Sequence, residues 1–141
     1  MVITAKDLKE DLKELWSIRD IWFVDPNYFL LEIKVVEDII KGLSNKKMNF
    51  IKNVWDCDNY SLLLNAEFKK WQYICLKCSP PDKPYYTWAF GECLASKVRG
   101  RTINHALNIA VCKEGVFLIE PQSDFIWKAD KNKDKLYFIK M

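Results

Sequence analysis

The 141 residues suffice for one domain, and because half of them are hydrophobic and 14% are aromatic, the chain can bury a core of its own. The 22 Lys and Arg residues barely exceed the 19 Asp and Glu residues and are interspersed with them, which argues against a nucleic-acid surface. No apolar run approaches the roughly 20 residues of a membrane span, and the charged N-terminus lacks a signal-peptide core, so we expect a cytoplasmic protein with no nucleic-acid or membrane partner.

Leucines recur at helical spacing near the N-terminus. Residues 4–16 therefore predict an amphipathic helix, for which Thr4 is a suitable N-cap. Residues 20–28 are aromatic and interrupted by an Asp-Pro pair, so we interpret them as a loop. Helical spacing returns over 32–43, which predicts a second helix that ends at the polar residues 44–47.

The third predicted helix carries the residue on which the functional interpretation depends. A short strand is expected over 49–54. The helix after it begins near Asp56 and Asn59, whose side-chain oxygens can accept the free amide hydrogens of a first turn. Cys57 is therefore predicted to lie at or near the amino end of this helix. The apolar face of the helix consists of Tyr60, Leu63, Leu64, Phe68 and Trp71.

Alternation and turn-forming residues replace helical spacing in the second half of the chain. We expect a rigid proline-rich loop over 79–84, a turn over 99–101 and a hairpin closed at 113–115. The predicted strands cover residues 72–77, 86–95, 105–112, 116–120, 125–129 and 135–140. Helices first and an antiparallel sheet afterwards predict an α+β fold, in a single domain over 1–141.

Three polar residues form a candidate active site. A cysteine attacks as the thiolate, which is favoured by the positive end of a helix dipole and by an imidazole that takes the proton, so Cys57 is the candidate nucleophile. His105, the only histidine, begins a predicted strand and is the candidate base. Glu120 ends the partner strand, and because cross-strand neighbours lie about 5 Å apart, its carboxylate can orient the imidazole.

Other residues compete for these roles. Asn104 and Asn108 are alternative partners of the imidazole, and Gln122 or the amides of Cys57 and Asp58 are candidate donors to an oxyanion. Purely structural interpretations also stay open. A cysteine that begins an apolar helix can be a buried small hydrophobe, and a lone histidine on a strand can be a hydrogen-bonded structural residue.

Two segments resemble the agglutinin C-terminal domain family. The first reads V-W-D-C-D-N-Y-S-L over residues 54–62. The second reads N-H-A-L-N-I over 104–109 and continues to F-L-I-E-P-Q-S-D over 117–124. An aromatic-Gly segment, W-A-F-G-E over 88–92, lies between them, and the likeness covers residues 28–127. The namesake of the family is the papain-like, dimer-forming domain attached to a mushroom galactose-binding agglutinin.

The resemblance implies a papain-like fold with a cysteine-protease-like site. Its nucleophile, base and acidic member fall on Cys57, His105 and Glu120, and the glutamine of its E-P-Q motif falls on Gln122. The helices would pack on the C-terminal antiparallel sheet, with the nucleophile at a helix N-terminus. Residues 1–27 match no pattern of the family and are predicted to be an N-terminal helical extension.

The resemblance also bears on ligands. It implies a peptide or protein substrate, for which we expect contacts with Trp55, Asp58 and Trp88, and it implies a possible homodimer. It implies calcium as a possible cofactor as well, because the mushroom protein needs a divalent cation, usually calcium, for activity. Here Asp56 and Asp58 are the only acids next to the nucleophile, which is a sparse ligand set for calcium. The sequence itself requires no cofactor.

The remaining cysteines are candidate zinc ligands, but a weak set. One C-x-x-C pair is present without a second, and on the predicted strand its two thiols would point to opposite faces. In the cytoplasm an odd count of five favours free thiols over disulfides. These four residues are Cys75, Cys78, Cys93 and Cys112.

The main functional prediction is a cysteine hydrolase of the thiol-protease or amidase type, acting through a thioester intermediate. One alternative is acyl transfer to an amine, as in a transglutaminase, because the same three residues serve when an amine replaces water. Another is a noncatalytic dimerisation or interaction module that keeps the fold for structural reasons.

Overall fold

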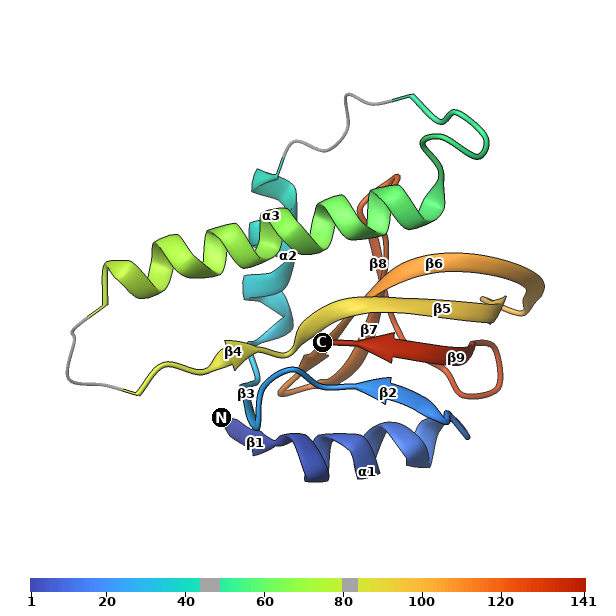
Figure 1. Cartoon of the computed structure of the whole chain (residues 1–141). Coiled ribbons are helices and arrows are strands. Elements are labelled where there is room, and N and C mark those ends of the chain that lie inside the picture. Colours follow the sequence, from blue (N-terminus) through green and yellow to red (C-terminus); the bar gives the residue numbers. More distant parts are fainter. Residues whose placement is uncertain (44–48, 80–83) are drawn as a thin grey trace.

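The computed structural model describes residues 1–43, 49–79 and 84–141, which form three helices and nine strands (Figure 1). The helices are α1 (Ala5–Leu15), α2 (Ile33–Gly42) and α3 (Cys57–Lys77). The strands are β1 (Val2–Thr4), β2 (Asp20–Trp22), β3 (Asn27–Phe29), β4 (Thr87–Trp88), β5 (Phe90–Val98), β6 (Arg101–Cys112), β7 (Gly115–Glu120), β8 (Phe125–Lys128) and β9 (Lys135–Lys140). The predicted helix end at 44–47 and most of the predicted loop over 79–84 lie outside the described residues.

The described strands form two sheets. The larger has the order β2-β9-β5-β6-β7-β8 and is antiparallel except for the β2–β9 pair. The smaller has the order β1-β3-β4. Two backbone hydrogen bonds join them, because Ala89 donates to the carbonyl of Phe29 at 3.2 Å and accepts from Val111 at 2.8 Å. The sheets are therefore parts of one hydrogen-bonded scaffold.

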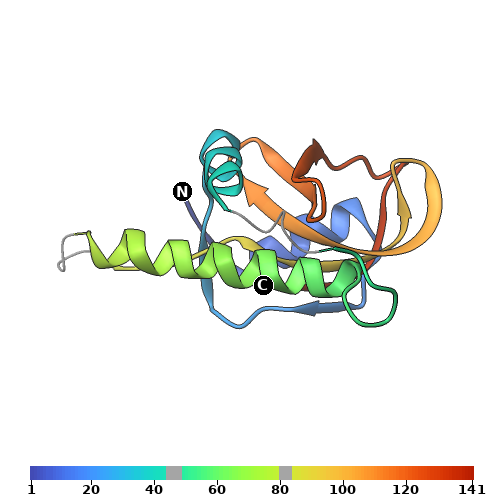
Figure 2. The same cartoon turned by 90° about the horizontal axis from the view of Figure 1, so that it is seen from above.

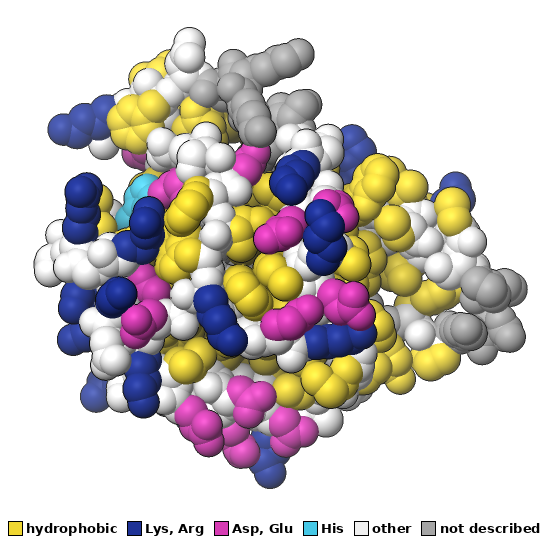
Figure 3. Space-filling view, turned by 180° about the vertical axis from the view of Figure 1, so that it is seen from behind, with side chains coloured by type: hydrophobic (Ala, Val, Ile, Leu, Met, Phe, Trp, Pro, Cys, Tyr) yellow, Lys and Arg dark blue, Asp and Glu magenta, His cyan; other side chains and the backbone are white. Residues whose placement is uncertain are grey.

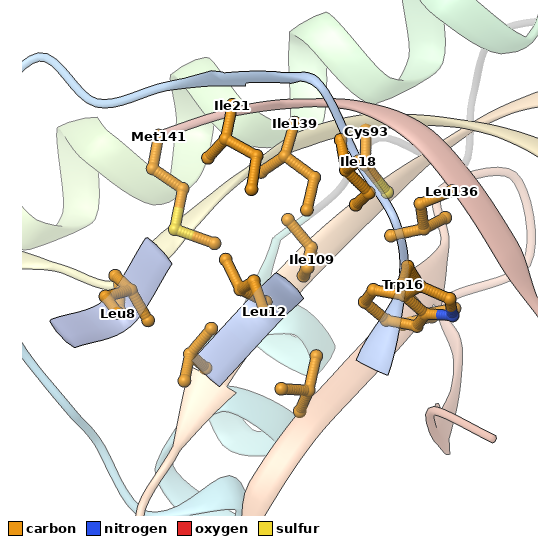
Figure 4. Packing of buried hydrophobic residues seen from close by; sticks show 14 of the residues in the cluster. Leu8, Leu12, Trp16, Ile18, Ile21, Cys93, Ile109, Leu136, Ile139 and Met141 are labelled. Carbon is orange, nitrogen blue, oxygen red and sulfur yellow. The ribbon is translucent and has the colours of Figure 1, made fainter. Parts of the chain in front are cut away.

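Helix α1 covers one face of the larger sheet (Figure 1). The Thr4 hydroxyl accepts the amide of Asp7 at 3.1 Å and so caps the helix as predicted. Leu8 and Leu12 are fully buried against β5, β6 and β9, together with Ile139 and the other side chains of Figure 4. Burying a leucine is worth about 1.5–3 kcal/mol, so this short helix is held by its packing.

Helices α2 and α3 cover the opposite face (Figures 1 and 2). Phe68 of α3 stacks on Phe90 of β5 with ring centroids 3.8 Å apart, and Trp88 meets Phe68 edge-on at 5.7 Å. Val36 and Ile40 of α2 complete this second core. The larger sheet thus lies between two helical layers.

Hydrogen bonds along α3 fix its direction over the sheet. Gln72 bonds to the backbone of β4, and Asn65 bonds to Glu92 near the start of β5. The Ser61 hydroxyl donates to the carbonyl of Leu107 at 2.9 Å. Residues earlier in α3 are therefore bonded to positions later along β4 and β5, since Leu107 lies opposite Cys93 of β5. Helix α3 thus runs antiparallel to β5. Its amino end therefore lies over the β5–β6 hairpin, as Figures 1 and 2 show.

The predicted papain-like α+β fold, with helices first and an antiparallel sheet afterwards, is wrong. Within the described residues the structure is mostly β, with two sheets and a single long helix, α3. The predicted helical extension over 1–27 contains α1 but also β1 and β2, and β2 enters the larger sheet as a parallel edge strand. The segment therefore completes the scaffold instead of extending it.

Individual elements were predicted with mixed success. The helices near 4–16 and 32–43 and the strands after residue 86 are confirmed, and the 99–101 turn has Arg99 and Gly100 with positive φ angles of 49° and 85°. The predicted loop over 20–28 is wrong because it contains β2 and the start of β3. The predicted strand over 72–77 is also wrong, since α3 continues through it.

The predicted strand over 49–54 is wrong as well. The segment instead leads into a turn, in which the amide of Ile51 donates to the carbonyl of Trp55 at 2.8 Å and the amide of Trp55 donates to the carbonyl of Ile51 at 2.7 Å. None of the described helices is both long and apolar enough to cross a membrane.

Candidate functional site

A histidine–carboxylate pair lies where β6 extends past the end of β7. The Nε2 atom of His105 is 2.6 Å from Oε2 of Glu120, a short distance typical of a charge-assisted hydrogen bond. The second carboxylate oxygen accepts the backbone amide of Gln122 at 3.3 Å. The two side chains are 17% and 24% exposed, so a ligand can reach them although the protein shields most of their surface.

This pairing leaves one ring nitrogen for chemistry. Because Nε2 of His105 is engaged by Glu120, Nδ1 is the atom at which the ring can accept a proton from another group. A carboxylate at one nitrogen fixes the ring orientation and stabilises the imidazolium that forms when the other nitrogen is protonated. The pair can therefore serve as an oriented base, and equally as a polar anchor for a ligand.

Cys57 is the first residue of α3, as predicted. A reciprocal capping box forms the helix start: the Asn59 side chain accepts the Asp56 amide at 3.2 Å, and the Asp56 side chain accepts the Asn59 amide. Asp56 also accepts the amide of Asn53, a residue with a left-handed φ of 61°. The thiol is half-buried in the first turn of the helix.

The register of α3 brings Cys57 to the same end of the sheet as His105. Ser61 bonds to Leu107, and Cys57 lies one helical turn before Ser61, whereas His105 lies two residues before Leu107. One helical turn and two strand residues each span about 6 Å. Cys57 and His105 therefore lie at similar distances along their elements from the Ser61–Leu107 hydrogen bond. Within the described residues, no hydrogen bond joins the Cys57 thiol to the His105 ring. In Figure 3 the imidazole is visible beside acidic side chains.

A cavity of about 880 Å³ opens next to the histidine–carboxylate pair. Its walls come from the end of β5, the β5–β6 turn, the first residues of β6, the β7–β8 turn and β8. Charged and aromatic side chains face each other across it, and the Cζ atom of Arg99 lies 4.7 Å from the ring centroid of Phe125. Besides His105 and Glu120, the lining includes Arg99, Arg101, Ile103, Phe125 and Trp127.

The other predicted site residues are distributed differently. Gln122 is exposed and contacts Glu120 through its backbone amide. Trp55 is half-buried beside the start of α3, edge-on to Tyr60 at 5.9 Å. Asp58 is exposed in the first turn of α3. Trp88, by contrast, is only 8% exposed in the core beneath α3 and does not line the cavity.

The two asparagines considered as partners of the imidazole do not act as such. Asn108 is fully buried, and its amide donates to the carbonyls of Ser61 at 2.9 Å and Gly91 at 3.1 Å, so it ties α3 to β5. Asn104 is exposed on the free end of β6. The orienting partner in the structure is Glu120.

The acids beside Cys57 do not fit calcium. The side chains of Asp56 and Asp58 hydrogen-bond to each other, which raises the pKa of Asp56 because one of the two carboxyls must hold a proton. Calcium needs several oxygen ligands arranged around it. No group of three His, Cys, Asp or Glu side chains in the described ranges could hold a metal ion.

The other cysteines differ sharply in accessibility. Cys93 and Cys112 are buried, and burial raises the pKa of both thiols, that of Cys112 to about 12. Cys75 and Cys78 occupy the last turn of α3 and its C-cap, not a strand, and Cys78 is exposed. Cys57, Cys75 and Cys78 are therefore the accessible thiols.

Sequence reasoning missed the arginines and aromatic residues of the cavity. Arg99 and Arg101 were recognised only as parts of a turn, and Phe125 and Trp127 only as parts of a strand. A signal was available, because the turn before β6 and the start of β8 flank His105 and Glu120 in any hairpin arrangement. Which of their side chains face the cavity depends on the twist of the strands, and the spacing of residues in the sequence does not reveal that twist.

The mostly-β fold of this domain also occurs in a mushroom lectin. In particular, the chain is similar to PSL1a in a structure described as "PSL1a-E64 complex", with a TM-score of 0.78, 18% identity and coverage of 99% of this chain and 50% of that one. It is also similar to Polyporus squamosus lectin bound to the human-type influenza-binding epitope Neu5Aca2-6Galb1-4GlcNAc, with a TM-score of 0.75, 18% identity and coverage of 99% and 49%. The chain thus spans about half the length of these lectin chains. No protein-family model and no curated protein matches the sequence.

These likenesses show a shared fold and correct the predicted class. The predicted hydrolase of the thiol-protease type is not supported, because the structures that share the fold are those of a lectin. The resemblance to a mushroom agglutinin is supported at the level of the fold.

Proposed function

We propose that the chain is an interaction module that binds a ligand in the cavity beside His105 and Glu120. The observation that carries this proposal is the cavity itself, whose volume of about 880 Å³ lies in the range of ligand pockets. Its mixture of aromatic surface and a few convergent polar groups is also typical of such pockets. The likeness to lectin chains, one of them bound to a sugar epitope, adds support.

Ligand-induced changes in the amide NMR spectrum of the full chain test this proposal. The ligands are a saccharide panel that includes Neu5Aca2-6Galb1-4GlcNAc and a degenerate peptide library. We expect shifts at residues 98–105 and 120–127. Phe125→Ala removes an aromatic cavity wall and should weaken binding roughly tenfold, the effect of losing one stacking contact of about 1–1.5 kcal/mol. Tyr137→Ala is the matched control, since the exposed fractions are 46% for Phe125 and 45% for Tyr137. Shifts confined to other surfaces would contradict the proposal.

A second candidate function is covalent chemistry at Cys57. The specific observation in its favour is the 2.6 Å contact between His105 and Glu120 at the end of the sheet over which α3 begins. In this proposal Cys57 is the nucleophile, Nδ1 of His105 takes its proton, and Glu120 orients the ring. Gln122 or the amides of Cys57 and Asp58 would stabilise developing negative charge, and Trp55 would border the bound electrophile.

The epoxide E-64 tests the second function, because a structure sharing this fold is a complex with it. The Cys57 sulfur would form a bond to an epoxide carbon, the carbon–oxygen bond would break, and the imidazolium proton would pass to the alkoxide. We expect one adduct by intact mass, located on Cys57 by peptide mapping. His105→Ala should slow labelling about 100-fold or more, the lower range for loss of a general base.

The accessible cysteines of α3 supply the control for this experiment. Cys75→Ser/Cys78→Ser should leave the labelling rate unchanged, and Cys57→Ser should abolish it. If E-64 labels Cys57, Cys75 and Cys78 equally, exposure alone governs the reaction and the thiol is not activated. Sedimentation of the unlabelled chain tests the possible homodimer separately.

A further inference from the structure

The first half of β6 has a free edge. Strand β6 begins at Arg101, but its pairing with β7 begins only at Asn108, opposite Ile119. Residues 101–107 pair with β5 on one side, and no described strand pairs with them on the other. The cavity opens along this edge. Residues 101–104 are exposed, so their backbone groups and side chains are available to a partner.

Two guanidinium groups, those of Arg99 and Arg101, lie beside this edge. Within the described residues, no ion pair involves Arg99 or Arg101, although both line the cavity. Arg99 is held in place, because its amide donates to Asp134 at 2.8 Å and its guanidinium lies over the Phe125 ring. In Figure 3 dark-blue Lys and Arg side chains gather on the same side of the molecule as the imidazole. A planar guanidinium binds a carboxylate through two parallel hydrogen bonds.

The acids of the cavity limit where an anionic group can bind. The Glu120 carboxylate is already used by His105 and by the amide of Gln122. Asp124 also lines the cavity, at the β7–β8 turn. A ligand carboxylate is therefore favoured at the Arg99–Arg101 end, and the half-exposed Ile103 and Phe125 offer apolar surface next to it.

We propose that this cavity binds an extended acidic peptide, which adds a strand to the free edge of β6 and places a carboxylate side chain at Arg99 and Arg101. A peptide fits better than a compact anion, because a free strand edge supplies backbone hydrogen bonds along its length and the neighbouring pockets select alternate side chains. The inference rests on the proposed ligand-binding function and names the class of ligand.

Affinity selection from a degenerate heptapeptide library on the immobilised full chain tests this inference. We expect Asp and Glu to be enriched at one position of the bound peptides. For the best peptide, replacing that acid by its amide should weaken binding about tenfold, the effect of losing a hydrogen bond to a charged group. Arg99→Gln/Arg101→Gln should remove the acid preference, and Lys131→Gln, on an exposed turn, should leave it unchanged. Thermal unfolding confirms that each variant is folded.

Hydrogen exchange supplies the second readout. Binding of the selected peptide should slow amide exchange within 101–106, and N-methylation of alternate peptide amides should abolish that protection. Peptides enriched without an acid preference, or protection only elsewhere, overturn the inference while leaving ligand binding in the cavity intact. If no peptide is enriched but the saccharide panel shifts the cavity resonances, the inference also fails and the proposed function stands. If neither class binds, both fail.

Discussion

Lys69 is a lysine that the fold largely removes from water. Its Nζ atom donates to the carbonyl of Trp88 at 3.4 Å, a long hydrogen bond. Burial lowers the pKa of Lys69 from its ordinary value of 10.5 to about 8, although the negative charge of Asp25 opposes this shift. The neutral amine is thus favoured in the folded protein relative to the unfolded chain.

This shift predicts how stability depends on pH. Because the folded-state pKa lies below the unfolded-state value, the folded protein releases the Lys69 proton first, and stability rises as pH increases from about 8 to 10.5. Below pH 8 the buried charge destabilises the fold, by at most about 3.5 kcal/mol at roughly 1.4 kcal/mol per pKa unit. Lys69→Met should therefore stabilise the protein at pH 7 and flatten this pH dependence.

Urea unfolding between pH 7 and 10.5 measures the effect. Lys70→Met, a change at the exposed neighbour, is the matched control and should not change the slope of stability against pH. Equal effects of the two substitutions would show that burial of Lys69 is not the cause.

The parts of the candidate site that could be predicted are those fixed by residue spacing along paired strands or at a helix start. The hairpin closed near Gly115 returns Glu120 toward His105, so that contact follows from counting residues on two adjacent strands. The cap residues Asp56 and Asn59 likewise predict that α3 begins at Cys57. The position of Trp88 was not predictable, because only the packing of α3 decides that its side chain enters the core.

At the scale of elements, short strands were the main failure of sequence reasoning. Strands β2 and β3 have three residues each, too few for a recognisable alternation, and they exist because partners far along the chain supply their hydrogen bonds. Residues 72–77 resemble a strand in composition but continue α3, since Gln72 is anchored to β4. Long periodic segments such as 4–16 were predictable because their signal is local.

Two glycines provide a test of how closely the elements approach. A Cβ atom at Gly91 of β5 would collide with the backbone carbonyl of Lys140 in β9 and lie 2.8 Å from Cγ of Met141. We therefore expect Gly91→Ala to destabilise the protein by about 3 kcal/mol or more, since backbone cannot yield as a side chain can. Gly42→Ala in α2 meets no atom within 4 Å and should stabilise it by about 0.5–1 kcal/mol.

Chemical denaturation of both variants measures this contrast. A similar loss of stability in both would contradict the close approach of β5 and β9. The Gly42 variant also reports whether the last turn of α2 is helical in solution.

At the scale of the whole molecule, one sheet serves two cores. Leu107 and Ile109 of β6 point toward α1, whereas Ala110 and Cys112 point toward α2 and α3. Because alternate residues of the same strands fill both cores, neither core can lose its packing without disturbing the backbone that supports the other. The chain should therefore unfold in a single transition.

Substitutions in opposite cores test this coupling. Leu12→Ala and Phe68→Ala remove fully buried side chains on the two sides of the sheet, and each should lower the free energy of unfolding by about 2–5 kcal/mol. The side chains share no contacts, so the two losses should add within about 0.5 kcal/mol in the double variant, provided that it still folds. Unfolding monitored by near- and far-ultraviolet circular dichroism should coincide for each variant, and separate transitions would refute the shared scaffold.

The indole of Trp16 donates to the carbonyl of Asp134, a contact between residues 118 positions apart, and β2 pairs with β9 over a similar separation. At a translation rate of about 5–20 residues per second, roughly 6–24 seconds pass between the synthesis of α1 and the synthesis of β9. For that interval the part of the packing around its leucines that β9 supplies is missing, so we expect the nascent chain to be a substrate for holding chaperones. Translation speed and chaperone supply, more than intrinsic folding rate, should then set the yield of native protein.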